Sequence, residues 1–149
     1  PYDDLKSTAY LMVGLPGAGK DTYIENNLSN VPEISLDDIR KELDIDPDDE
    51  QGRVIQEAKK RAKTFLAHGE DFIWNSTNTT KLIRDKMRRI FMDYNAYIHI
   101  IYVSTSRSEA QKRNDKRHYK NKVPSSIINS LFRSLDPPTE IECHKLTIV

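Results

Sequence analysis

The sequence has only one cysteine, Cys143, and no apolar run long enough to cross a bilayer. A single cysteine cannot form an internal disulfide, and no Cys/His spacing is typical of a zinc site, so disulfide-rich secreted modules and zinc domains are excluded. No basic and apolar signal segment opens the chain. These absences favour a cytoplasmic protein that has no membrane partner.

The formal net charge is zero, yet the charges are separated along the chain. Residues 33–50 hold nine Asp or Glu, whereas residues 106–122 hold seven Lys or Arg. A local basic segment can neutralise phosphates on a nucleotide or a nucleic acid even in a neutral molecule. A length of 149 residues suffices for one core. We expect one domain over residues 1–149, and the start at Pro1 rather than Met suggests that it comes from a longer polypeptide.

Glycines are few, but three of the five lie between Gly14 and Gly19, directly before Lys20. The spacing Gly-x4-Gly-Lys after an apolar run predicts a phosphate-binding loop, in which backbone N–H groups and a helix N-terminus face the phosphates. Lys20 can then reach the terminal phosphates of an NTP. We expect the NTP to contact Pro16, Gly17, Ala18, Gly19, Lys20, Asp21 and Thr22.

Asp21 departs from the usual loop, which has Ser or Thr at this position to bind Mg²⁺. The hydroxyl comes one residue later, at Thr22. Mg²⁺ favours oxygen ligands and keeps several waters, so Asp21 can bind the ion directly or hold one of its waters. Mg²⁺ and an NTP, ATP or GTP, are therefore the expected cofactors.

Apolar strand patterns alternate with helical patterns along the chain. Strands are expected at residues 9–13, 33–36, 72–74, 96–103 and 145–149, and helices at 20–28, 37–43, 51–68, 80–94, 106–116 and 125–135. This alternation predicts an α/β fold of the P-loop NTPase class, with a mostly parallel sheet and helices on both faces. The basic segment at about residues 106–123 is expected to form a helical lid.

Ligands of such folds bind at the carboxyl ends of the strands. Asp37 follows the second predicted strand, where its carboxylate can accept a proton from an attacking hydroxyl or, alternatively, cap a helix. Arg40 lies one helical turn later and can face the same cleft or form an exposed ion pair. Thr77 and Asn78 follow the third strand, where they can hold a substrate or support the phosphate loop.

Arg113 and Arg117 are four residues apart, so one helix face would carry both guanidinium groups. Two such groups can converge on one phosphate and stabilise the charge that spreads over a transferred phosphoryl group. We therefore predict that both arginines act on the NTP from the lid.

The order of these motifs resembles the kinase domain of phage-type 5′-OH polynucleotide kinases over nearly the whole chain. The resemblance rests on the phosphate loop, Asp-Asp-x-Arg after a strand, Thr-Asn after the next, and Lys-Arg-Asn-x-Lys-Arg followed by Val-Pro. It implies that Lys20 binds the β- and γ-phosphates, that Asp37 is the general base, and that Arg40 binds a phosphate of the acceptor. It further implies that Thr77 and Asn78 line the acceptor pocket and that Arg113 and Arg117 form the lid.

Two positions depart from that family, because Asp21 replaces a Ser and Ser76 stands where an Asp is usual. The resemblance implies transfer of a γ-phosphate to the 5′-OH end of RNA or DNA in nucleic-acid repair. A looser similarity to bacterial fusions with an HD-type phosphohydrolase suggests a covalently linked end-healing domain.

Two other functions are compatible with the same loop. A small-molecule kinase, acting on a nucleoside, sugar or antibiotic hydroxyl, would use the same Lys20 and Asp37. It differs in its acceptor, which needs no phosphate contact at Arg40. A non-catalytic NTP-binding switch would keep Lys20 but would have no use for the carboxylate of Asp37.

Overall fold

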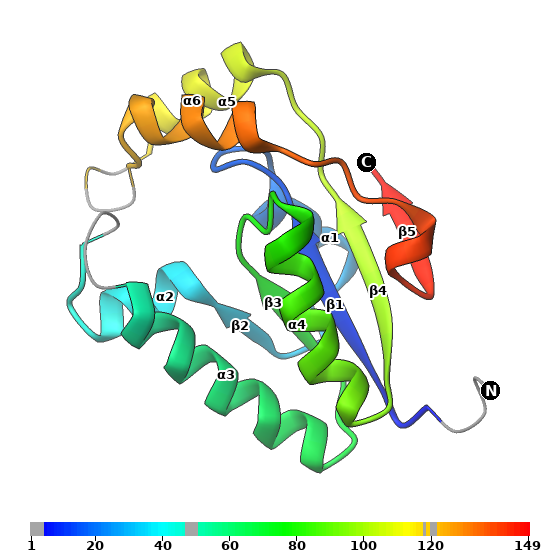
Figure 1. Cartoon of the computed structure of the whole chain (residues 1–149). Coiled ribbons are helices and arrows are strands. Elements are labelled where there is room, and N and C mark those ends of the chain that lie inside the picture. The colour runs from blue at the N-terminus through cyan, green and yellow to red at the C-terminus, as the bar shows by residue number, and fades with distance from the viewer. Residues whose placement is uncertain (1–4, 47–50, 118, 120–121) are drawn as a thin grey trace.

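A computed structural model describes residues 5–46, 51–117, 119 and 122–149 (Figure 1). Its centre is a sheet of five strands in the order β2-β3-β1-β4-β5, and every neighbouring pair is parallel. The strands are β1 (Ser7–Val13), β2 (Glu33–Ser35), β3 (Phe72–Asn75), β4 (Ala96–Tyr102) and β5 (Lys145–Ile148). The order places β1 in the middle, so the loop that follows it emerges at the centre of the sheet edge.

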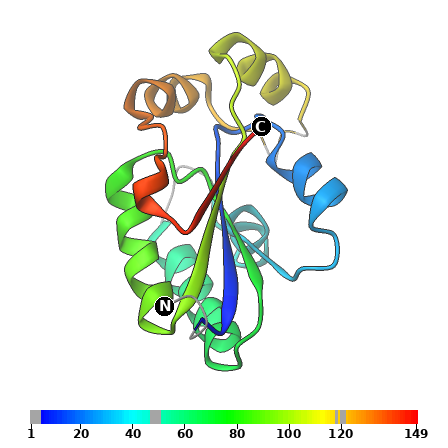
Figure 2. The same cartoon turned by 90° about the vertical axis from the view of Figure 1, so that its right-hand side faces the viewer.

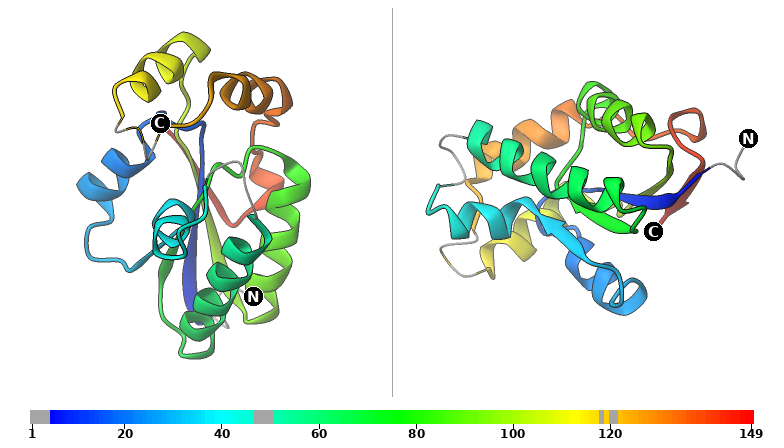
Figure 3. Two further views of the ribbon diagram at one scale, coloured as in Figure 1. Left: turned by 90° about the vertical axis from the view of Figure 1, so that its left-hand side faces the viewer. Right: turned by 90° about the horizontal axis from the view of Figure 1, so that it is seen from below.

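The helices lie on both faces of the sheet, as Figure 3 shows. They are α1 (Lys20–Asn27), α2 (Leu36–Glu42), α3 (Gln51–Ala67) and α4 (Lys81–Asp93). The larger core cluster joins α3 and α4 to one face, and a smaller cluster that includes Ile24 joins α1 to the other. The central strands β1, β3 and β4 are mostly apolar because they are covered on both sides.

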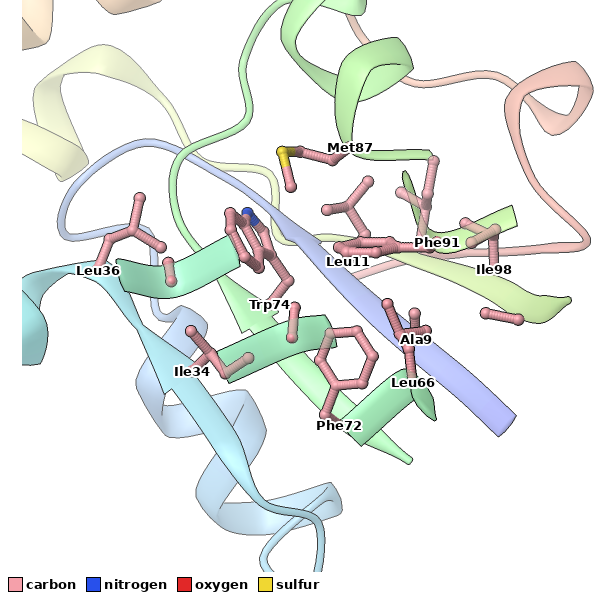
Figure 4. Close-up of a cluster of buried hydrophobic side chains, with 14 of the residues drawn as sticks. Ala9, Leu11, Ile34, Leu36, Leu66, Phe72, Trp74, Met87, Phe91 and Ile98 are labelled. Carbon is pink, nitrogen blue, oxygen red and sulfur yellow. The ribbon is translucent and has the colours of Figure 1, made fainter. Parts of the chain in front are cut away.

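Aromatic side chains fill the larger core (Figure 4). Trp74 and Phe91 pack edge to face with ring centroids 5.7 Å apart, and Phe91 meets Phe72 in the same way at 5.2 Å. Burying rings of this size is a large stabilising contribution and fixes α4 against β3. Trp74 directly precedes Asn75, so this packing also holds the carboxyl end of β3 in place.

Two further helices, α5 (Arg107–Asp115) and α6 (Ser125–Ser134), lie beyond the carboxyl ends of the strands (Figure 2). They pack on each other through Ala110 and Ile128, which join Leu15 of the phosphate loop in a buried cluster. Asn114 ties the end of α5 to the segment before α6, because its side chain accepts from the Val123 N–H at 2.9 Å and donates to the Val123 carbonyl at 2.6 Å. The predicted lid thus rests on the loop; its residues 118, 120 and 121 lie outside the described residues.

The predicted fold class and elements are confirmed, with ends that differ by a few residues. The expectation that Arg113 and Arg117 share one helix face is wrong, because α5 ends at Asp115. The N–H groups of Lys116 and Arg117 bond to carbonyls three residues back, which tightens the chain and turns Arg117 off the helix. A short helix, η2 (Glu140–Glu142), was not expected. Within the described residues, no helix combines the length and apolar character that a membrane span requires.

Candidate active site

The phosphate loop curls through two glycines with left-handed backbone, Gly17 at φ 82° and Gly19 at φ 106°. A β-carbon on Gly17 would lie 3.0 Å from the Ala110 carbonyl oxygen of α5. Both the backbone conformation and the close approach of the lid helix therefore require glycine at position 17. The next helix starts at Lys20, so its free N–H groups face the loop.

The Lys20 side chain folds back over the loop and its ammonium donates to the Gly14 carbonyl at 2.8 Å. Burial lowers the pKa of Lys20 to about 8, although the nearby carboxylates of Asp37 and Asp21 oppose the shift. The charge is therefore retained at neutral pH inside a confined site, where it acts strongly on any phosphate.

Asp37 lies at the centre of a group of positive charges. Arg40 donates to Asp37 Oδ1, and Arg117 Nη2 approaches Asp37 Oδ2 at 3.6 Å. Burial alone would raise the pKa of Asp37, but Arg40, Lys20 and Arg117 outweigh it and hold the pKa below its ordinary value. The cap of α2 is Ser35 and not Asp37, because the Ser35 hydroxyl accepts from the Asp38 N–H. The Asp37 carboxylate is thus ionised and faces the cleft.

Arg113 reaches the loop from the lid. Its Nη1 donates to the Ala18 carbonyl at 2.8 Å, while its Nε donates to Glu109 at 2.9 Å. Arg113 and Arg117 therefore approach the phosphate loop from different parts of the lid, one on the helix and one after it. Both line the same cavity.

Asp21 is held by a residue of the neighbouring strand. The Asn75 amide donates to Asp21 Oδ1 at 2.9 Å and to Glu33 Oε2 at 2.7 Å. No group of three or more His, Cys, Asp or Glu side chains in the described part of the chain is placed to hold a metal by itself. One or two carboxylate oxygens beside a phosphate site nevertheless suit Mg²⁺, which completes its shell with waters and substrate phosphates. Asp21 lines the larger cavity beside the loop, where it is placed to bind such an ion or one of its waters.

Thr77 and Asn78 lie beneath the phosphate loop. The Thr77 carbonyl accepts from the Gly14 N–H at 3.0 Å, and the Asn78 amide donates to the Met12 carbonyl at 2.7 Å. Asn78 is only 2% exposed and has a left-handed backbone with φ 48°. Its side chain supports the strand that leads into the loop, whereas Thr77 also lines a cavity.

Two cavities meet at this site. The larger, about 860 Å³, runs along the phosphate loop and the lid arginines; the smaller, about 280 Å³, lies between α2 and α6. Four residues line both cavities: Pro16, Lys20, Asp37 and Asn75. Asp37 therefore stands where a group bound in one cavity would meet a group bound in the other.

Three residues of this region were not singled out by the sequence patterns. Gln51 accepts from Arg40 Nε at 2.8 Å, and Glu33 accepts from Asn75. Arg84 is fully buried and donates to Asn78 O at 3.0 Å and to Glu142 at 2.8 Å. Only Arg84 carried a signal, since a charged residue on the apolar face of a predicted helix indicates a buried partner.

Comparison with known proteins identifies a family for this chain. The family model described as an AAA domain matches residues 10–138, and no curated protein matches the chain. The fold is similar to a solved structure of the Pnkp1/Rnl/Hen1 RNA repair complex, with TM-score 0.74 and 21% identity over 88% of this chain and 44% of that chain. The present chain thus spans less than half of that protein.

Two smaller kinases have a similar fold. A gluconokinase from Sinorhizobium meliloti 1021 gives TM-score 0.63 and 19% identity, covering 97% of this chain and 83% of that chain. The Mycobacterium tuberculosis APS kinase CysC, solved with AMPPNP and APS, gives TM-score 0.68 and 13% identity, covering 97% and 89%. The family match extends over most of the sequence and the fold agrees, so the chain belongs to the AAA domain family and has the fold of a P-loop kinase.

Proposed function

We propose that this protein transfers the γ-phosphate of an NTP to the 5′-hydroxyl of an RNA or DNA strand, in the repair of nucleic-acid ends. The observation that carries the proposal is the position of Asp37, which joins the two cavities and has Arg40 beside it on the smaller one. The larger cavity takes the NTP and the smaller takes the acceptor. The likeness to the Pnkp1 structure supports this reading over much of the chain.

The walls of the smaller cavity suit a nucleotide. Apolar side chains from α2 and the α6 region form one part of its lining, namely Leu36, Val123, Ile127 and Leu131. Arg40 and Gln51 lie on its polar side, together with the residues at the strand ends and the loop, namely Lys20, Asp37, Asn75, Ser76 and Thr77. An apolar wall accommodates a base or the faces of a ribose, and a guanidinium binds a phosphate, so the combination matches a nucleotide unit better than a polyhydroxylated sugar.

The reaction is an in-line transfer. A bond forms between the acceptor 5′ oxygen and the γ-phosphorus while the bond from that phosphorus to the β–γ bridging oxygen breaks, and the hydroxyl proton passes to Asp37. Lys20 and the loop N–H groups hold the β- and γ-phosphates, and Arg113 and Arg117 stabilise charge on the transferred group. Asp21 would hold Mg²⁺ directly or through a water, and the ion would supply neutralisation of the phosphate charge.

The small-molecule kinase is the second candidate, because the gluconokinase and the APS kinase share the fold and are of similar length. The same phosphate loop and Asp37 would serve such a reaction. The two candidates differ in whether the acceptor needs a phosphate at Arg40.

The deciding experiment supplies γ-labelled ATP or GTP, Mg²⁺ and a panel of acceptors: 5′-OH RNA and DNA oligonucleotides, a nucleoside 3′-monophosphate, the nucleoside and a sugar acid. We expect oligonucleotides and the 3′-monophosphate to be labelled and the nucleoside and sugar acid to be labelled poorly. Arg40→Gln should raise KM for the oligonucleotide and leave NTP affinity near wild type. Lys41→Gln, which removes an exposed charge from the next position of the same helix, is the matched control. Better labelling of the nucleoside or the sugar acid would assign the protein to the small-molecule kinases.

A further inference from the structure

Gln51 connects helix α3 to the arginine of the smaller cavity. It is the first residue of α3, and its side chain lines that cavity together with Arg40. Its Oε1 accepts from Arg40 Nε at 2.8 Å, and its Nε2 donates to the Asp46 carbonyl at 3.1 Å. Because the amide is bonded at both of its ends, its oxygen is directed to Arg40 by the backbone of the preceding segment.

The Arg40 guanidinium is held at two points by residues of different elements. Its Nη1 donates to Asp37 Oδ1, and its Nε donates to Gln51. A guanidinium is planar and rigid, so bonds from two of its nitrogens fix both its position and its plane. Nη2 takes part in neither of these bonds and is the nitrogen left to meet a ligand in the smaller cavity.

We propose that Gln51 is a positioning residue of the acceptor site, which holds the Arg40 guanidinium so that Asp37 and an acceptor phosphate meet different nitrogens of it. The inference rests on the proposed function, because it concerns an acceptor that carries a phosphate. Gln51 acts through Arg40 and does not touch the reacting atoms.

The bond to Gln51 keeps Arg40 from being taken up entirely by Asp37. A guanidinium and a carboxylate favour a two-pronged pair, in which two nitrogens of one meet both oxygens of the other. If Asp37 alone anchored Arg40, rotation of the guanidinium would allow that pair and leave fewer N–H groups for a phosphate. The bond from Nε to Gln51 opposes this rotation, and Arg117 Nη2 approaches the other carboxylate oxygen at 3.6 Å.

The neutral charge of Gln51 suits this role. Residues 33–50 hold nine Asp or Glu, and Gln51 follows that segment directly. The side chain that reaches Arg40 Nε is nonetheless an amide. A carboxylate at this position would orient Arg40 equally well, but it would cancel its charge and repel an acceptor phosphate. An amide orients the guanidinium and leaves its charge available to the ligand.

The test compares a nucleoside 3′-monophosphate with the nucleoside as acceptors, using γ-labelled ATP and Mg²⁺. Gln51→Met keeps the length of the side chain and removes its amide. KM for the 3′-monophosphate should rise about 10-fold in this variant, the effect of losing a hydrogen bond to a charged group. KM for ATP and kcat/KM for the nucleoside should stay near wild type. Gln56→Met, which replaces an exposed glutamine of the same helix, is the matched control.

The sharper arm is a double-mutant cycle with Arg40→Gln. Because Gln51 acts through Arg40, Gln51→Met should add no further rise in KM once the guanidinium is absent. A role in the structure of α3 alone would have the same effect in both backgrounds. Gln51→Asn is a second variant, one methylene too short to reach Arg40, and it should match Gln51→Met. It decides the question if thermal unfolding shows that Gln51→Met does not fold.

A KM for the 3′-monophosphate that is the same in wild type and in the Gln51 variants overturns the inference. An equal rise in KM with and without Arg40 overturns it too. If the wild-type protein labels the nucleoside as well as its 3′-monophosphate, the proposed function fails and the inference fails with it. A wild-type preference for the 3′-monophosphate that the Gln51 variants leave unchanged counts against the inference alone.

Discussion

Replacing Arg84 with Met should destabilise the whole domain by about 3–5 kcal/mol, because it removes one member of a buried ion pair. The Arg84 side chain is 0% exposed and that of Glu142 is 2% exposed, and their closest atoms are 2.8 Å apart. Arg84 Nη1 also donates to the Asn78 carbonyl at 3.0 Å. In the variant the buried Glu142 carboxylate would keep only its bonds from Thr139 among those the structure shows.

The measurement is urea unfolding followed by circular dichroism, with the melting temperature as a second readout. At about 2–4 °C per kcal/mol for a domain of this size, the loss corresponds to a fall in Tm of roughly 6–20 °C. Lys81→Met is the matched control, because its ion pair with Asp85 is on the same helix but the Lys81 side chain is 60% exposed; it should cost under about 1 kcal/mol.

The double variant Arg84→Met with Glu142→Leu should be more stable than Arg84→Met alone, since no buried charge is left without its partner. A loss in Arg84→Met as small as that in Lys81→Met would refute the reasoning. So would a double variant that is less stable than the single one.

Three shorter predictions concern the loop, the base and the sheet. Gly17→Ala should weaken binding of an ATP analogue, because Gly17 has a positive φ and the new β-carbon would lie 3.0 Å from the Ala110 carbonyl oxygen. Gly52 on α3 has open space around it, so Gly52→Ala should stabilise the protein by about 0.5–1 kcal/mol. Asp37→Asn should lower kcat by about 10²–10⁴-fold with analogue binding retained; near-normal turnover would exclude the general-base role. Burial, aided by Lys145, lowers the pKa of His99 from 6.5 to about 4. Between these pH values the unfolded chain binds more protons than the folded protein. The free energy of unfolding should therefore fall on acidification, by at most about 1.4 kcal/mol per pH unit. His99→Gln should flatten that part of the pH profile, and an unaltered profile would rule out His99 as its source.

Local patterns were sufficient to predict the elements and the phosphate loop. The loop depends on glycine spacing within seven residues, and each strand on its own run of apolar residues, so neighbouring positions carry the information. The place of Asp37 at a strand end followed from the parallel topology. These features are properties of short segments and need no knowledge of distant contacts.

The remaining features depend on pairs that are far apart in the sequence. Asn75 meets Glu33 across 42 positions, and Arg84 meets Glu142 across 58. The position of Arg117 was missed for a different reason, because the end of α5 depends on how Asn114 binds the backbone of Val123 and not on helix propensity. Propensity and periodicity do not report such contacts.

The charges around Asp37 serve as counterions for one another inside the cleft. Arg40 and Arg117 are already paired with that carboxylate, Lys20 with a carbonyl, and Arg113 with Glu109 and the loop. An arriving phosphate therefore exchanges partners with the protein and does not simply neutralise a bare positive surface. Small anions offer too few contacts to compensate for the bonds that they displace, whereas a nucleotide engages several of these groups at once. We therefore expect these internal pairs to favour ligands that carry several phosphates over small anions.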